Sequence, residues 1–135
     1  MEYSAQRVAN FFLDKAELEK LPMTQMKLLK LAYFAYGWIA AILDKPLFPD
    51  EIEAWQHGPV IPSLYHEFKE FGQSPITRRA INFDLDTESV ETPRIDRNDE
   101  DTLFVLERVW DIYKRFSAGA LRAKTHEDDT PWKKV

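Results

Sequence analysis

The sequence contains no cysteine among its 135 residues. Disulfide bonds, cysteine nucleophiles and zinc sites built from cysteine are therefore excluded. It also has no glycine-rich phosphate loop and no serine in the Gly-x-Ser-x-Gly context of many hydrolases. These absences remove several common classes of enzyme, and the lack of thiols fits a reducing cytoplasm.

An excess of basic charge is also missing. The chain has 18 Lys and Arg against 23 Asp and Glu, a net charge of −5. Affinity for nucleic acid depends on basic side chains, so generic binding to DNA or RNA is not favoured. The nearest basic group is Arg78–Arg79, followed much later by Lys114–Arg115, and these residues are spread along the chain rather than gathered.

Long hydrophobic runs are scarce. The N-terminus does not begin with basic residues followed by an apolar stretch, so we expect no secretory signal. The most apolar run, Leu31–Leu43, is shorter than the roughly 20 residues of a membrane-spanning helix. We therefore expect a cytoplasmic protein whose apolar run is a buried core helix, with no membrane contact.

Metal-binding patterns are absent as well. The three histidines, His57, His66 and His126, do not pair at helical spacing. The acidic stretch 96–107 resembles a calcium loop but carries Asp101 where that loop needs glycine. We therefore predict no metal ion, no cofactor and no catalytic residues.

The length, with 44% hydrophobic residues, predicts a single domain over residues 1–135. Apolar residues recur at helical spacing in five segments: about 4–18, 25–43, 62–71, 99–116 and 118–124. We predict a mainly α fold, a compact helical bundle of about five helices. Alternating residues at 51–55 and 80–85 predict a short β-hairpin or extended segments, and the polar stretch 86–99 predicts a surface loop.

Local signals set the expected helix ends. Ser4, Thr24 and Asn98 are predicted N-caps, and Gly72 is a predicted stop. In the second helix, leucines are expected to face the core, with Lys27 and Lys30 on the polar side. Within the same helix, Gly37 predicts a close approach of another backbone.

Aromatic residues are abundant: nine Phe, five Tyr and four Trp. Several lie in "AWQHGPVIPSLYHEF", residues 54–68. Gly58, Pro59 and Pro62 are expected to fix a stiff corner between an extended segment and the third helix. Rings held at that corner could either fill the core or serve as anchors for a protein partner. The pattern leaves both interpretations open for Trp55 and Tyr65.

The run "KLLKLAYFAYGWIAAILDKPLFPDEIEAWQHGPVIPSLYHEF" and the tail "THEDDTPWKK" resemble the Panacea-domain, SocA-like antitoxin family. Some of its members were first labelled phage-associated proteins. The resemblance implies a mainly helical antitoxin without enzymatic activity, which neutralises a toxin encoded by an adjacent gene through direct contact. One member acts as an adaptor to a Clp-type protease, so such a protease is a further implied partner.

Matching positions supply the candidate residues. Those considered for partner binding are Trp55, His57, Tyr65, His126 and Trp132. Those considered structural are Glu53, Gly58, Pro59, Val60, Pro62, Thr125 and Pro131. One position departs from the family pattern: an apolar residue usually precedes Thr-His in the family, and this chain has Lys124 there. Two alternatives stay open: a DNA-associated regulator, and a small enzyme using His57 and His126.

Overall fold

The computed structural model describes residues 3–56 and 58–125, which form five α-helices and two small antiparallel hairpins. The helices are α1 (Ala5–Leu18), α2 (Gln25–Leu43), α3 (Pro62–Phe68), α4 (Glu100–Tyr113) and α5 (Ala118–Thr125), with a 3₁₀ turn, η1 (Lys69–Phe71), after α3. Strand β1 (Glu53–Trp55) pairs with β2 (Gly58–Val60), and β3 (Asn82–Asp84) pairs with β4 (Ser89–Glu91). The predicted mainly α fold of about five helices is confirmed.

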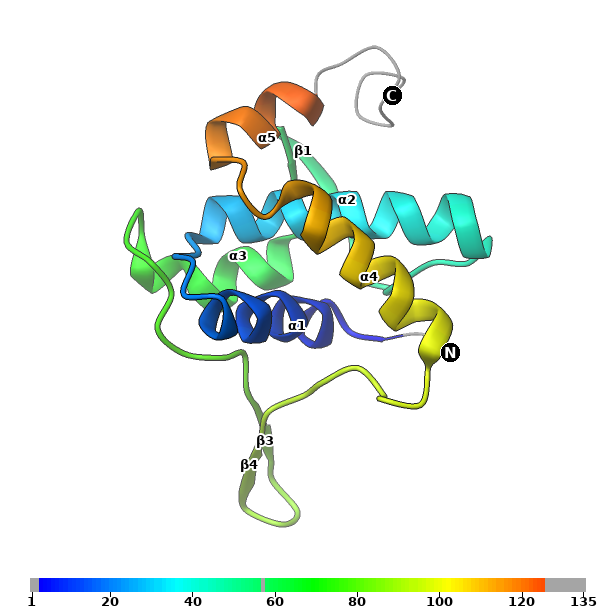
Figure 1. Cartoon of the computed structure of the whole chain (residues 1–135). Coiled ribbons are helices and arrows are strands. Elements are labelled where there is room, and N and C mark those ends of the chain that lie inside the picture. Colours follow the sequence, from blue (N-terminus) through cyan, green and yellow to red (C-terminus); the bar gives the residue numbers. More distant parts are fainter. Residues whose placement is uncertain (1–2, 57, 126–135) are drawn as a thin grey trace.

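Helix α2 lies at the centre of the fold. Helices α1 and α3 lie on one side of it, α5 on the other, and α4 crosses it (Figure 1). Its buried side chains join those of α1 and α4 in one apolar core, in which Phe12 and Trp110 are completely enclosed. The indole N–H of Trp110 donates to Glu19 at 2.7 Å, which satisfies the only polar atom of that side chain.

By length and composition alone, α2 could cross a membrane. It has 19 residues and a mean hydropathy of 1.4, because the helix begins six residues before Leu31. The length argument made from Leu31–Leu43 was therefore wrong. Core helices of soluble proteins meet the same criterion, and half of the apolar window is buried inside this fold. Packing against the other helices is enough to explain its composition.

The helix-end predictions are confirmed at three positions and wrong at one. Ser4 and Thr24 accept hydrogen bonds from the backbone N–H groups of Arg7 and Lys27, and Gly72 ends η1 with a φ of 56°. The N-cap of α4 is Asp99 rather than Asn98, because the helix starts one residue later than expected. The Asp99 side chain accepts from the N–H of Thr102.

Three other expectations need correction. No atom lies within 4 Å of a side-chain carbon built at Gly37, so that glycine does not serve close backbone packing. Lys30 does not lie on a polar side of α2 but is fully buried. The stretch 86–99 is not all loop, since residues 89–91 form β4. Strand β4 has only three residues, and Val90 is its only apolar residue. The sequence therefore shows no alternation there that could predict a strand.

Candidate protein-binding groove

The β1–β2 hairpin and the start of α3 form the corner predicted from the sequence. Gly58 has a φ of 114°, a backbone conformation that residues with a side chain rarely adopt. Gly58, Pro59 and Val60 are buried. Pro62 occupies the first turn of α3, where its missing N–H costs no hydrogen bond. The corner is therefore part of the packed fold rather than a mobile loop.

A buried lysine holds this corner against α2. The Lys30 ammonium donates to the carbonyl oxygen of Pro59 at 3.0 Å, and no part of its side chain is exposed. Burial, with a smaller contribution from the positive charge of Arg122, lowers the pKa of Lys30 to about 8. A buried cation beside one carbonyl pays a desolvation cost, so Lys30 specifies where the corner sits rather than adding much stability.

Two aromatic side chains stand on the outer side of the corner. The rings of Trp55 and Tyr65 meet edge to face, with centroids 5.1 Å apart. Trp55 is 37% exposed and Tyr65 is partly buried. The indole N–H of Trp55 donates to the carboxylate of Glu53 at 2.9 Å. Glu53, predicted as a structural residue, therefore also helps to orient the Trp55 ring.

These rings line an apolar groove of about 590 Å³ between the start of α2, the corner and the start of α5. The other lining residues are Thr24, Gln25, Met26, Leu29, Val60, Gly72, Gln73 and Ala118. The side-chain oxygen of Gln25 is buried and accepts no hydrogen bond from any described residue. The groove thus presents a mainly apolar surface, and the enclosed Gln25 oxygen is not exposed on it.

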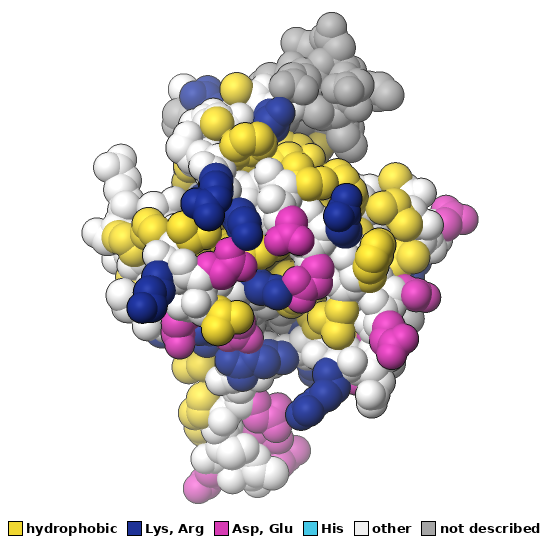
Figure 2. Space-filling view, viewed as in Figure 1, with side chains coloured by type: hydrophobic (Ala, Val, Ile, Leu, Met, Phe, Trp, Pro, Cys, Tyr) yellow, Lys and Arg dark blue, Asp and Glu magenta, His cyan; other side chains and the backbone are white. Residues whose placement is uncertain are grey.

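A second groove, of about 440 Å³, continues from the first across Thr24 and Ala118. Its floor includes Leu21, Pro22 and Phe116, and its rim carries Lys27, Lys114 and Arg115. Figure 2 shows Lys and Arg side chains around α5 and the neighbouring end of α4. Basic residues therefore lie beside the aromatic groove, although Lys114 is paired with Glu19 and Asp111.

Several basic residues in the described part of the chain are paired with carboxylates. Arg78 pairs with Glu67 and Glu70, and Arg79 pairs with Asp14 and Glu17. Lys114 pairs with Glu19 at 2.9 Å. Because their charges are neutralised locally, these positions offer little to a phosphate backbone.

The remaining candidate residues lie partly inside and partly outside the part of the chain that the structure describes. Thr125 is the last residue of α5. His57, His126, Pro131 and Trp132 lie outside the described residues, so the histidine-based enzyme reading rests on residues that the structure does not describe. Within residues 3–56 and 58–125, no group of three or more His, Asp or Glu side chains lies close enough to hold a metal ion.

Sequence reasoning found the aromatic pair but missed most of the groove. Met26 and Leu29 belong to the apolar side of α2, and nothing in the sequence separates groove-lining leucines from core leucines. Gln73 and Ala118 come from segments far apart in the chain and meet only in the folded protein. Gly72 was predicted only as a helix stop.

Comparison with known proteins agrees with the resemblance seen in the motifs. The model of the family described as "Antitoxin SocA-like, Panacea domain" matches residues 28–133. The protein named Antitoxin SocA from Caulobacter vibrioides is 37% identical over 131 residues, which cover 95% of this chain and 68% of that protein. No solved structure gives a significant match. The chain therefore belongs to the SocA-like antitoxin family and carries its Panacea domain.

Proposed function

We propose that this protein neutralises a cognate toxin by direct protein–protein contact in the cytoplasm, and that the groove beside Trp55 and Tyr65 holds the toxin. Membership of an antitoxin family implies a toxin partner. The observation that supports the site is the aromatic pair of exposed Trp55 and partly buried Tyr65, which lines an apolar groove of about 590 Å³. Aromatic side chains that enter or line such pockets dominate the energy of many protein interfaces.

Rigidity of the corner is the physical reason to favour this surface. The Gly58 conformation, the two prolines and the bond from Lys30 to Pro59 hold the backbone that carries the aromatic pair. Edge-to-face packing and the bond to Glu53 restrict Trp55 further. Side chains that are already ordered lose less conformational entropy when a partner binds, so more of the contact energy appears as affinity.

The residues that line the groove also indicate which side chains of the toxin it can bind. Its apolar lining favours an aliphatic or aromatic toxin side chain. Arg115, which lines the adjoining groove, favours a carboxylate nearby. We therefore expect an apolar toxin segment with an acidic residue beside it.

Co-expression with the product of the adjacent gene tests the proposed function. The neighbour alone should arrest growth, and this protein should restore growth and purify in complex with it. A harmless neighbour, or restored growth without any complex between the two proteins, would contradict neutralisation by direct contact.

The protease-adaptor role implied by the resemblance is a separate property. If it holds here, the amount of toxin in co-expressing cells should fall in the presence of a Clp-type protease and recover when that protease is deleted. Unchanged toxin levels in the two strains, with growth restored in both, would indicate that binding alone is sufficient.

A further inference from the structure

The β3–β4 hairpin has an apolar face that no described part of the protein covers. Phe83 and Val90 are directly opposite each other in the strand register, so their side chains share one face. They are 58% and 59% exposed. Ile81, which precedes β3 at the same alternation, is 45% exposed, and Leu85, the first residue of the turn, is 81% exposed. The opposite face carries Asn82, Asp84, Ser89 and Glu91.

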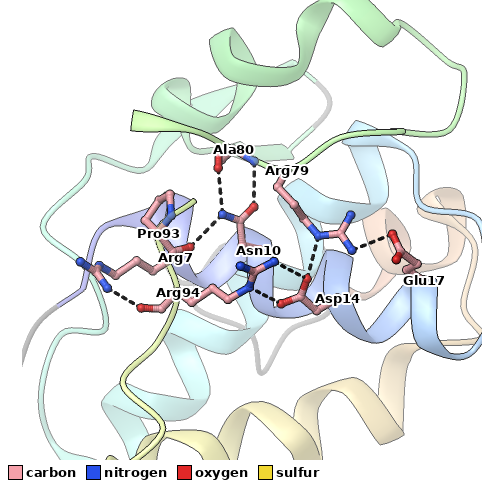
Figure 3. Close-up of polar contacts among 8 residues, drawn as sticks. All are labelled: Arg7, Asn10, Asp14, Glu17, Arg79, Ala80, Pro93 and Arg94. Atoms are coloured by element: carbon pink, nitrogen blue, oxygen red, sulfur yellow. Dashed lines mark hydrogen bonds and ion pairs between the residues drawn. The ribbon is translucent and has the colours of Figure 1, made fainter. Parts of the chain in front are cut away.

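The hairpin projects from the helical body (Figure 1) and is held firmly at its base. Asn10 of α1 is fully buried, and its amide binds both stems of the hairpin (Figure 3). It donates to the carbonyl oxygens of Ala80 and Pro93 at 3.0 and 2.8 Å and accepts from the N–H of Ala80 at 2.8 Å. The two stems are therefore fixed to α1 before the strands begin.

Charged side chains reinforce this base. The carboxylate of Asp14 lies between two guanidinium groups, at 2.7 Å from Arg79 and at 2.7 and 3.0 Å from Arg94 (Figure 3). Arg7 also donates to the carbonyl oxygen of Arg94. Each stem of the hairpin thus has both a backbone anchor and an ionic anchor on α1.

Such a strongly held base contrasts with the uncovered tip. A two-stranded hairpin is only marginally stable in water, and four neighbouring apolar side chains in solvent add nothing to its stability. An alternating apolar and polar pattern normally marks a strand with one buried face. A contiguous exposed apolar surface on a rigid support is typical of a protein interaction site.

Charge and area indicate what covers this face. Residues 82–91 include Asp84, Asp86, Glu88 and Glu91 and no Lys or Arg, so a second copy of the hairpin would meet like charges. At roughly 100 Å² for each exposed side chain, the face offers only about 400 Å² per protomer, half of what a standard interface needs. The hairpin is better suited to contribute to an interface with a basic partner than to form a dimer alone.

We propose that the apolar face of the hairpin, formed by Ile81, Phe83, Leu85 and Val90, is a second contact for the toxin, which meets it with an apolar patch rimmed by Lys or Arg. This inference rests on the proposed function. The groove alone, with about ten lining residues, falls short of the 20–30 residues per side of a standard interface. A second contact supplies the missing area.

The two surfaces lie within reach of one partner. Gln73 lines the groove and Asn82 begins the hairpin, so nine residue steps join them, at most about 30 Å of chain. A standard interface of about 800 Å² per partner has a diameter of roughly that size. In Figure 1 the β1–β2 corner and α5 lie at the other end of the molecule from the hairpin, so a toxin that touches both surfaces must extend along the helical body between them.

The test measures binding of the purified product of the adjacent gene to the full chain and two variants. Phe83→Ser removes the central ring of the apolar face. Leu18→Ser is the matched control, because Leu18 is also an exposed apolar residue, at 77%, but lies on α1 away from the hairpin. Circular dichroism and thermal unfolding confirm that each variant is folded. We expect Phe83→Ser to raise Kd at least tenfold and Leu18→Ser to leave it within twofold of wild type.

A further hairpin variant removes two negative charges from the hairpin and keeps the apolar face intact. Asp84→Asn combined with Glu91→Gln should weaken binding and flatten the dependence of Kd on salt, since both carboxylates are lost. Wild-type affinity in both Phe83→Ser and the charge variant would overturn the hairpin proposal and leave the proposed function intact. Conversion of a dimer of the isolated protein to a monomer by Phe83→Ser would overturn it too, because a second copy would then cover the face. Failure of the wild-type protein to bind would remove both proposals.

Discussion

The side-chain amide of Asn10 forms two reciprocal hydrogen bonds with the backbone of Ala80, 70 residues further along the chain. A third bond, to the carbonyl oxygen of Pro93, brings the other stem of the β3–β4 hairpin to the same side chain. One buried amide thus binds both stems of the hairpin, alongside the ion pairs of Asp14 with Arg79 and Arg94. Its contribution to stability and to hairpin position can be measured separately.

Replacing Asn10 with alanine should destabilise the protein by about 3 kcal/mol, because it leaves one buried N–H and two carbonyl oxygens without partners. Urea unfolding followed by circular dichroism measures this change. Hydrogen exchange should increase at the stems of the hairpin more than in α2 or α4. A variant as stable as wild type would show that water or other groups satisfy these atoms.

Acid should loosen the base of the hairpin. Burial alone would raise the pKa of Asp14, but the hydrogen bonds and charges of Arg94 and Arg79 outweigh it and lower the pKa below its ordinary value of 3.8. This stabilisation is present above pH 3.8 and is lost as the pH falls through the folded-state value. Asp14→Asn should therefore lower stability at pH 7 and make it less dependent on pH below 4, as measured by urea unfolding at several pH values. Parallel pH profiles for both proteins would contradict the assignment.

Lys30 should also make stability fall as the pH falls, but in the alkaline range and because of burial rather than loss of an ion pair. Its pKa is lowered from 10.5 to about 8, so the fold prefers the neutral amine. The cost of burying the ammonium grows as the pH falls from 10.5 to 8 and is constant below 8. The stability of Lys30→Met relative to wild type should therefore rise by about 3 kcal/mol as the pH falls from 10.5 to 8.

Paired unfolding measurements from pH 7 to 10.5 would detect this change. The lost bond to Pro59 shifts the stability difference between the two proteins by an amount that does not vary with pH. The change of that difference with pH therefore reports the burial of the ammonium. A stability difference that stays constant over the whole range would show that Lys30 is not desolvated as described.

Gly58→Ala should destabilise the corner. A φ of 114° is strained for any residue with a side chain, and the cost is about 1–3 kcal/mol. Gly119→Ala is a suitable control, because Gly119 lies in α5 and only the Ser117 hydroxyl, at 3.9 Å, lies near the added carbon. Thermal unfolding should show a lower midpoint for the first variant alone. Equal midpoints would mean that the corner adapts to a side chain.

The sequence predicted the helices well because their signals are local. Apolar stripes and capping residues such as Ser4 and Thr24 lie within a few positions of the structure they determine. The same reasoning failed for Lys30, because a lysine between leucines looks like part of a solvated face. Only the Pro59 carbonyl, contributed from 29 residues away, makes its burial possible.

The candidate site was predictable only in part. Trp55 and Tyr65 were recognisable because they flank a motif of glycine and proline that stiffens the chain. The groove itself depends on contacts between distant segments, and no local pattern reports them. The alternation at 80–85 predicted a strand, but a strand pattern does not reveal whether its apolar face is covered. In this protein no part of residues 3–56 or 58–125 covers it, and this exposure is the basis for proposing the hairpin as a contact surface.

The affinity of the toxin for Trp55→Ala tests the central claim most directly, with Leu18→Ala as the exposed apolar control. Trp55 is 37% exposed and contributes an edge-to-face contact to the fold, so its loss removes about 1 kcal/mol from the ring pair and also the area that the ring buries. Thermal unfolding must therefore confirm that the variant is folded. We predict a folded variant whose Kd for the toxin is at least tenfold higher than that of the wild-type and Leu18→Ala proteins. A folded Trp55→Ala protein with wild-type Kd would contradict the account and place the toxin-binding surface elsewhere.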